Sequence, residues 1–142
     1  MVHTAHGPVY PIQVADALGD LPEVDLAVVY GVPSAAGQVA VAAVSKWGSE
    51  VISAADIGGA LASVPADGQP DIVHVVPDIP VTNWYRPDAT ALAARGLPKA
   101  GPRTWIRDRD TGGYVRLTKA VRDGIVSPTE WKMTTTTLPR HW

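Results

Sequence analysis

The chain has 142 residues, a formal net charge of −2 and no cysteine. Its length suits one domain of ordinary size. The lack of cysteine excludes disulfides, thiolate metal sites and a cysteine nucleophile. The charge balance argues against a non-specific nucleic-acid binder. Neither a membrane-spanning apolar run nor a secretory signal is visible, so we expect a cytoplasmic protein without a membrane span.

The apolar residues, 46% of the chain, include 20 alanines and 19 valines but no phenylalanine. We therefore expect a core of small and β-branched side chains. A short helix is predicted over residues 11–21, because Pro11 suits a first helical turn. The apolar segments 24–32 and 38–45 are predicted to be strands of one antiparallel hairpin.

Ser53 is a favourable N-cap for a helix over residues 54–64, with Asp56 near the positive helix end. The Gly58-Gly59 pair inside this helix is interpreted as permitting close packing on the sheet. Residues 71–77 form the third predicted strand. A helical turn is expected at 90–95, a hairpin at 104–107 and 114–117, and a last helix at 118–125 capped by Thr118.

These elements predict an α+β fold in which a small sheet packs with helices and a C-terminal hairpin and helix follow. The central strands of that sheet are 24–32, 38–45 and 71–77. We assign residues 1–126 to the domain. Residues 127–142 are polar, include four consecutive threonines and are expected to form a tail.

Most of the residues and motifs that could carry chemistry have a structural explanation. His74 lies within a predicted strand, where a structural role is favoured over that of a general base. The loop from Gly31 to Gly37 lacks the lysine of a phosphate loop and is interpreted as a turn. Asp108 and Asp110 are interpreted as a solvated hairpin tip. No metal site is predicted. The segment 79–87 is the exception. Two aromatic residues and Arg86 follow a buried strand there in an irregular stretch, and loops at strand ends often carry function.

Several segments resemble the small C-terminal domain of adenylate-forming acyl-CoA synthetases. A strand ends in Gly31-Val-Pro33 and returns as residues 39–44, and residues 11–18 resemble an upstream helix of that family. Residues 75–86 align without gaps to a family motif that ends in the adenylation lysine. Residues 105–117 are similar to an extension found in the fatty-acid-transport, very-long-chain branch. The resemblance covers about residues 8–125.

Two residues depart from the family motif: Arg86 replaces its lysine and Tyr85 replaces its glycine. Arginine keeps the charge, but its planar fork differs in shape. The resemblance implies that Thr82, Trp84, Tyr85 and Arg86 contact substrate or a partner, with Arg86 in the catalytic position. The family's large ATP-binding domain has no counterpart in this sequence. The resemblance therefore implies no cofactor for this chain alone, and ATP and CoA for an assembled enzyme.

Three hypotheses follow. The first is a free-standing C-terminal-type domain of a fatty acid–CoA ligase, inactive alone and acting with a separate adenylation domain. The second is a non-catalytic binding or scaffold module on the same fold. The third is a small enzyme with a new activity, because a fold does not determine function. Whether the chain is an enzyme, and its oligomeric state, are left open by the sequence.

Overall fold

The computed structural model describes residues 2–4, 7–34, 37–47, 52–77, 79, 89–101, 103–108 and 111–125. The strands within these ranges are β1 (Val2–Thr4), β2 (Gly7–Val9), β3 (Val24–Ser34), β4 (Gly37–Lys46), β5 (Ile72–Val76), β6 (Thr104–Arg107) and β7 (Tyr114–Arg116). The helices are α1 (Pro11–Gly19), α2 (Ala54–Leu61), α3 (Ala89–Ala94), α4 (Lys119–Ile125) and the 3-10 turn η1 (Ala66–Gly68). The predicted tail and its boundary at residue 126 lie outside the described residues.

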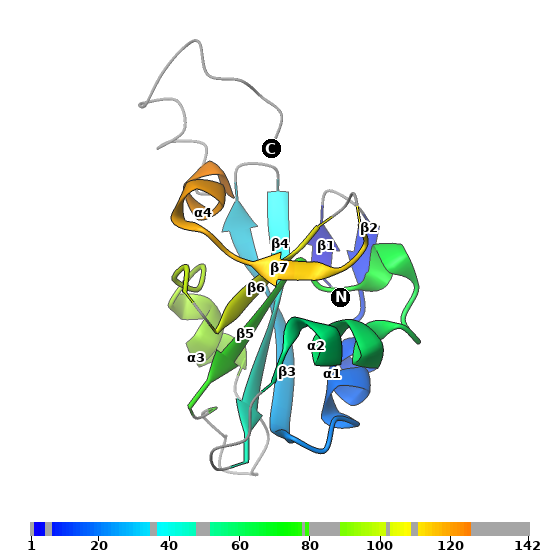
Figure 1. Ribbon diagram of the computed structural model, residues 1–142. Helices are drawn as coiled ribbons and strands as arrows, with labels where there is room; N and C mark the ends of the chain where they lie inside the picture. The colour runs from blue at the N-terminus through cyan, green and yellow to red at the C-terminus, as the bar shows by residue number, and fades with distance from the viewer. Residues whose placement is uncertain are drawn as a thin grey trace, which may run out of the picture.

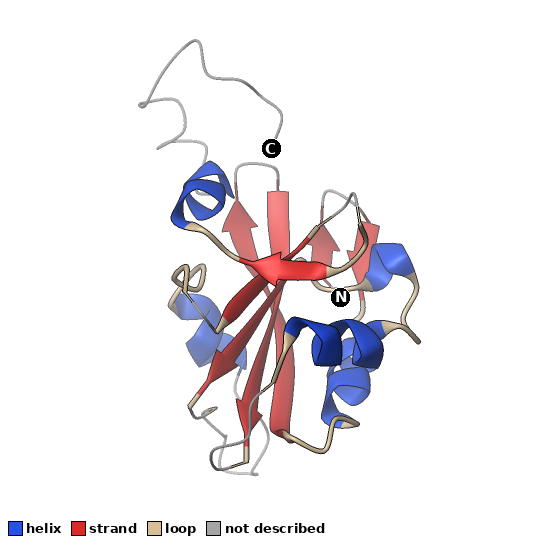
Figure 2. Ribbon diagram, viewed as in Figure 1, coloured by secondary structure: helices blue, strands red, loops and turns tan. Residues whose placement is uncertain are grey.

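The seven described strands form one mixed sheet with β4 at its centre (Figures 1 and 2). Strand β3 pairs antiparallel with β4 from Val24–Lys46 to Ser34–Gly37, which confirms the predicted hairpin. Strands β1 and β5 both run parallel to β4, β1 at Gln38 and β5 from Val41 onward. Beyond β5 the sheet continues through β6 and β7. The three predicted central strands are confirmed to within two residues at each end.

Helices cover both faces of the sheet (Figure 1). Helices α1 and α2 pack on a first core cluster that includes Leu18, Ile57 and Leu61. Helices α3 and α4 pack on a second cluster through Leu92 and Ile125. Strand β4 alternates between the two clusters, and its residues 39–45 are all buried. A strand covered on both faces needs apolar residues throughout, which explains the continuous run of alanine and valine. The α+β class is confirmed.

Several local predictions need correction. The N-terminal strands β1 and β2 were not predicted, because three-residue strands are too short to show an alternating pattern. The C-terminal hairpin is part of the main sheet, since β6 pairs with β5. Helix α1 ends at Gly19 and α2 at Leu61, both earlier than expected. The carboxamide of Gln69 donates to the carbonyls of Leu61 and Val64 at 2.9 and 3.1 Å and closes the turn after α2.

The interpretation of Gly58 and Gly59 is wrong. A Cβ atom built on either glycine would meet nothing within 4 Å, so neither permits a close approach to the sheet. The predicted start of α2 is confirmed, because Ser53 Oγ accepts from the backbone of Asp56 and the Asp56 carboxylate accepts from the backbone of Ser53. The Thr118 cap of α4 is also confirmed, with the Val121 N–H donating to Oγ1 at 3.3 Å.

Candidate functional site

The predicted site loop is described at its two ends. Thr82, Trp84, Tyr85 and Arg86 themselves lie outside the described residues. Before the loop, β5 ends at Val76, and Ile79 is 2% exposed within the second core cluster. After it, α3 places Leu92 in the same cluster. Both ends of the loop are therefore fixed on the face of the sheet that α3 and α4 cover.

The loop begins at the carboxyl end of two parallel strands. Strand β4 ends beside β5, with Ser45 paired to Val76. Figure 1 shows both strands pointing toward the same end of the sheet. In α/β sheets, ligands bind outside the carboxyl ends of neighbouring parallel strands, because loops from different strands meet there. This edge, formed by the ends of β4 and β5, is the candidate functional site.

The structure adds Lys46 and Trp47 to this edge. Lys46 is the last residue of β4, and Trp47 is 56% exposed directly after it. The Trp47 N–H donates to the Glu23 carbonyl at 3.0 Å, which ties the end of β4 to the chain just before β3. The sequence already indicates this arrangement, because the helix predicted between strands 38–45 and 71–77 favours their parallel pairing.

His74 lies two residues before the end of β5 and pairs with Ala43 and Thr104. It is half-buried, and its strand neighbours Ile72 and Val76 belong to the second core cluster. Burial lowers the pKa of His74 from 6.5, so the imidazole is neutral at pH 7. These apolar surroundings agree with the structural role that the sequence favours.

The other two candidate motifs are described only in part. Residues 31–34, interpreted as part of a turn, lie in β3, and residues 35 and 36 lie outside the described residues. The Ser34 hydroxyl donates to the Gly37 carbonyl at 2.8 Å between β3 and β4, where Gly37 has a φ of 102° that favours glycine. In the β6–β7 hairpin, the Asp108 N–H donates to the Gly113 carbonyl at 2.8 Å. Asp110 lies outside the described residues. Among the described residues, no group of three histidine, aspartate or glutamate side chains could hold a metal ion.

The described part of the chain contains no helix with the length and apolar character that crossing a membrane requires.

No family model and no curated protein matches this chain. Solved structures do match it. ATP-bound MatB from Rhodopseudomonas palustris aligns with a TM-score of 0.56 and 25% identity, over 61% of this chain and 18% of MatB. The amide bond synthetase McbA from Marinactinospora thermotolerans gives 0.54 and 28%, with the same coverages. A Mycobacterium tuberculosis fatty acyl CoA synthetase gives 0.58 and 25%, over 67% of this chain and 19% of that one.

These neighbours are adenylate-forming ligases, which agrees with the superfamily that the sequence resembles. The match spans less than a fifth of each neighbour's length. The similarity therefore concerns one small part of those enzymes, and more than four fifths of each has no counterpart in the 142 residues of this chain.

Proposed function

We propose that this chain is the C-terminal-type domain of an adenylate-forming ligase and works on a large adenylation domain supplied outside these 142 residues. The observation that carries the proposal is the structural match over 61–67% of this chain but only 18–19% of its neighbours. The resemblance of residues 75–86 to the adenylation motif supports it independently. By this account the isolated chain does not adenylate, because it lacks the nucleotide-binding part.

The proposed reaction has two steps. A carboxylate attacks the α-phosphate of ATP to give an acyl adenylate and pyrophosphate, and the thiol of CoA then displaces AMP to give a thioester. Arg86 occupies the position of the cation that meets the carboxylate and the phosphate in the first step. A guanidinium can hold such oxygens through two parallel hydrogen bonds. We assign Thr82, Trp84 and Tyr85, on the same loop, to contacts with substrate or with the large domain.

The fixed ends of this loop support that assignment. Ile79 is buried and α3 is packed on the sheet, so the candidate residues lie between two secured anchors. Lys46 and exposed Trp47, at the end of the neighbouring parallel strand, are proposed to form the other wall of the same site.

A fatty acid is the proposed acyl substrate. The similarity of residues 105–117 to the fatty-acid-transport branch supports it, as does the structural match to a fatty acyl CoA synthetase. A second candidate acceptor is an amine in place of CoA, because the amide bond synthetase McbA matches at 28% identity. Product analysis separates the two, since one reaction gives a thioester and the other an amide.

A non-catalytic module on the same fold is the rival function. Its supporting observation is the pair of departures in the motif, where Tyr85 and Arg86 stand in place of glycine and lysine. Glycine allows a backbone to approach a ligand more closely than tyrosine does. A module of this kind would bind its partner and leave the partner's rate of adenylation unchanged.

Variants of Arg86 test the proposal. The assay combines this chain with a large adenylation domain whose own C-terminal domain has been removed, and follows pyrophosphate exchange and thioester formation. Arg86→Ala should abolish the gain in rate, and Arg86→Lys should keep part of it because the charge survives. The control is Arg95→Ala, which removes an exposed arginine on the turn after α3. Equal activity of Arg86→Ala and Arg95→Ala would refute the role of Arg86.

A further inference from the structure

The charges of this chain are strongly segregated. Of the 12 lysines and arginines, only Lys46 precedes residue 86, whereas nine of the 14 acidic residues lie within the first 78. The net charge of −2 conceals this division. The fold converts it into a spatial one, because the first part of the chain forms α1, β3 and α2, and the last part forms α3, β6, β7 and α4.

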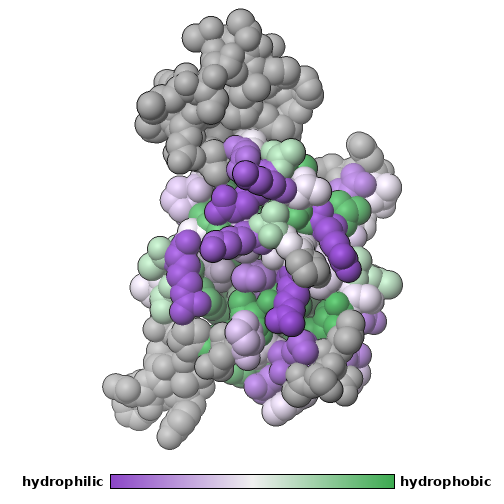
Figure 3. Space-filling model, turned by 60° about the vertical axis from the view of Figure 1, so that its left-hand side comes forward, coloured by the Kyte–Doolittle hydropathy of each residue, from purple (hydrophilic) through white to green (hydrophobic). Residues whose placement is uncertain are grey.

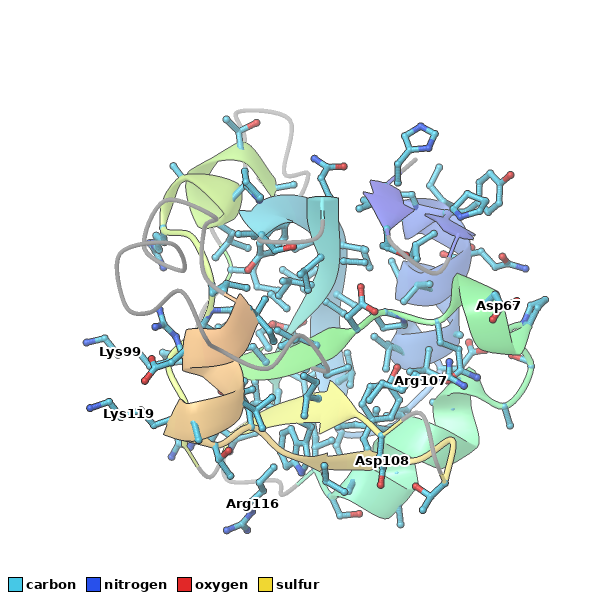
Figure 4. The ribbon with its side chains drawn as sticks, turned by 90° about the horizontal axis from the view of Figure 1, so that it is seen from above. Asp67, Lys99, Arg107, Asp108, Arg116 and Lys119 are labelled. Atoms are coloured by element: carbon cyan, nitrogen blue, oxygen red, sulfur yellow. The ribbon has the colours of Figure 1, made fainter. Side chains whose placement is uncertain are left out.

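Four exposed cations lie on the elements at the β6–β7 end of the sheet: Arg116 on β7, Lys119 at the start of α4, and Lys99 and Arg103 in the segment before β6. We call this set the basic edge. Arg122 holds α4 there by donating to the carbonyls of Leu97 and Pro98 at 3.2 and 2.8 Å, which brings the start of α4 close to Lys99. Figure 4 shows Lys99 and Lys119 projecting from the same side of the domain. Figure 3 shows hydrophilic side chains gathered over this side.

Three exposed acids lie at the opposite edge: Asp16 on α1, Asp20 directly after α1, and Asp25 at the start of β3. We call this set the acidic strip. Helix α1 lies against β3, which is separated from β7 by β4, β5 and β6. With strands about 4.8 Å apart, β3 and β7 lie roughly 20 Å from each other. Asp67, also exposed, lies across the domain from Lys99 and Lys119 (Figure 4).

The charges are not explained by local stability. Within the described residues, no ion pair or hydrogen bond engages the side chains of the basic edge. Asp20 caps the carboxyl end of α1, where a negative charge opposes the helix dipole and no basic residue occupies the last turn. A cation on an edge strand can prevent aggregation, which would account for Arg116 on β7. It does not account for Lys99 and Lys119, which lie off the strand.

The chemistry of the basic edge favours a protein surface as its partner. The exposed aromatic residues recorded in the described ranges, Tyr10 and Trp47, lie in the other half of the chain. Single-stranded nucleic acids and bilayer interfaces both use aromatic side chains, for stacking or for anchoring. The basic edge instead offers cations and two half-exposed valines, Val115 and Val121. Cations around small apolar side chains suit an acidic protein surface.

We propose that the basic edge docks on the acidic strip of a second copy of this chain. The complementary surface is part of the same sequence, and the two sets lie on opposite edges of one sheet. The contact is therefore heterologous, with each copy offering one edge to a neighbour on either side. This inference does not depend on the proposed function.

Sedimentation at two salt concentrations tests the docking. At about 10 mM salt the charges act over about 30 Å, whereas at about 150 mM they act over about 8 Å. We expect the wild-type chain to self-associate at low salt, at least about tenfold more tightly than at the higher salt. Lys119→Gln should weaken association. Lys46→Gln removes the same charge beside the acidic strip, where Lys46 pairs with Val24, and should not weaken it. A chain that stays monomeric at low salt would overturn the proposal.

Mixing two variants gives the decisive test. Lys99→Gln/Lys119→Gln lacks part of the basic edge, Asp16→Asn/Asp20→Asn lacks part of the acidic strip, and neither should associate alone. All four positions are exposed, so both variants should fold. Mixed together they should form a discrete 1:1 complex, because each keeps the surface that the other lacks. Failure to form that complex would refute the docking. So would binding of the wild-type chain to anionic phospholipid vesicles without self-association.

Discussion

Asp71 forms the backbone hydrogen bonds of the central strand β4 at Ala40, where neither β1 nor β5 pairs with it. One edge of β4 is shared by β1, which pairs at Gln38, and β5, which pairs from Val41 onward. Ala40 falls in the gap between them and is 0% exposed. Its N–H donates to Asp71 Oδ2 at 2.9 Å, and its carbonyl accepts from the Asp71 N–H at the same distance. A single residue thus satisfies both backbone groups.

We therefore expect Asp71→Ala to lower the free energy of unfolding by about 2 kcal/mol, because the buried Ala40 N–H loses its acceptor. Asp71→Asn keeps an oxygen at that place and should lose less than half as much. The backbone bond from Asp71 to the Ala40 carbonyl survives in both variants. Urea titration of the three proteins at neutral pH measures the differences. A loss below about 0.5 kcal/mol for Asp71→Ala would show that the carboxylate does not support the strand.

Three further predictions concern helix α2 and His74. Gly59→Ala should raise the free energy of unfolding by about 0.5–1 kcal/mol, since the added Cβ meets nothing within 4 Å in a helix; a loss in thermal unfolding would contradict this. Ser53→Ala should lower it by about 1 kcal/mol, because the Asp56 N–H loses its cap; an unchanged urea midpoint would count against the capping box. The lowered pKa of His74 makes protonation harder in the folded state, so the stability due to its neutral form is present above pH 6.5 and is lost as the pH falls through the folded pKa. His74→Gln should therefore lose less stability than the wild type between pH 7.5 and pH 5, as measured by urea titration, and parallel profiles would refute the assignment.

The sequence predicted the central hairpin well, because β3 and β4 are long and carry a continuous apolar pattern. It did not predict β1 and β2, which have three residues each and are too short to show an alternating pattern, and it gave no sign that β1 joins the sheet at Gln38. It also treated the C-terminal hairpin as separate from the sheet. The pairing of Val73 with Trp105 joins two segments 32 residues apart, and no local propensity determines such a contact.

The candidate site, like the fold, was predicted from the sequence only in part. Loop 79–87 was recognised from its composition and from the family motif, and the buried Ile79 marks where it begins. Trp47 was not predicted to lie at the site, although the helix between the two strands favours the parallel pairing of β4 with β5 that places it there. The prediction that the Gly58-Gly59 pair permits close packing was wrong for a different reason. A sequence gives the residue type but does not show whether the space beside it is filled.

The central claim is that this chain completes a separate adenylation domain, and the gain in rate on mixing tests it most directly. Purified chain is added to a large adenylation domain without its own C-terminal domain, together with a fatty acid, ATP and CoA, and the acyl thioester is measured. The account predicts that each protein alone stays at background and that the mixture forms thioester in proportion to the added chain. A mixture that remains at background, although the two proteins bind each other, would contradict the catalytic role and favour the non-catalytic module.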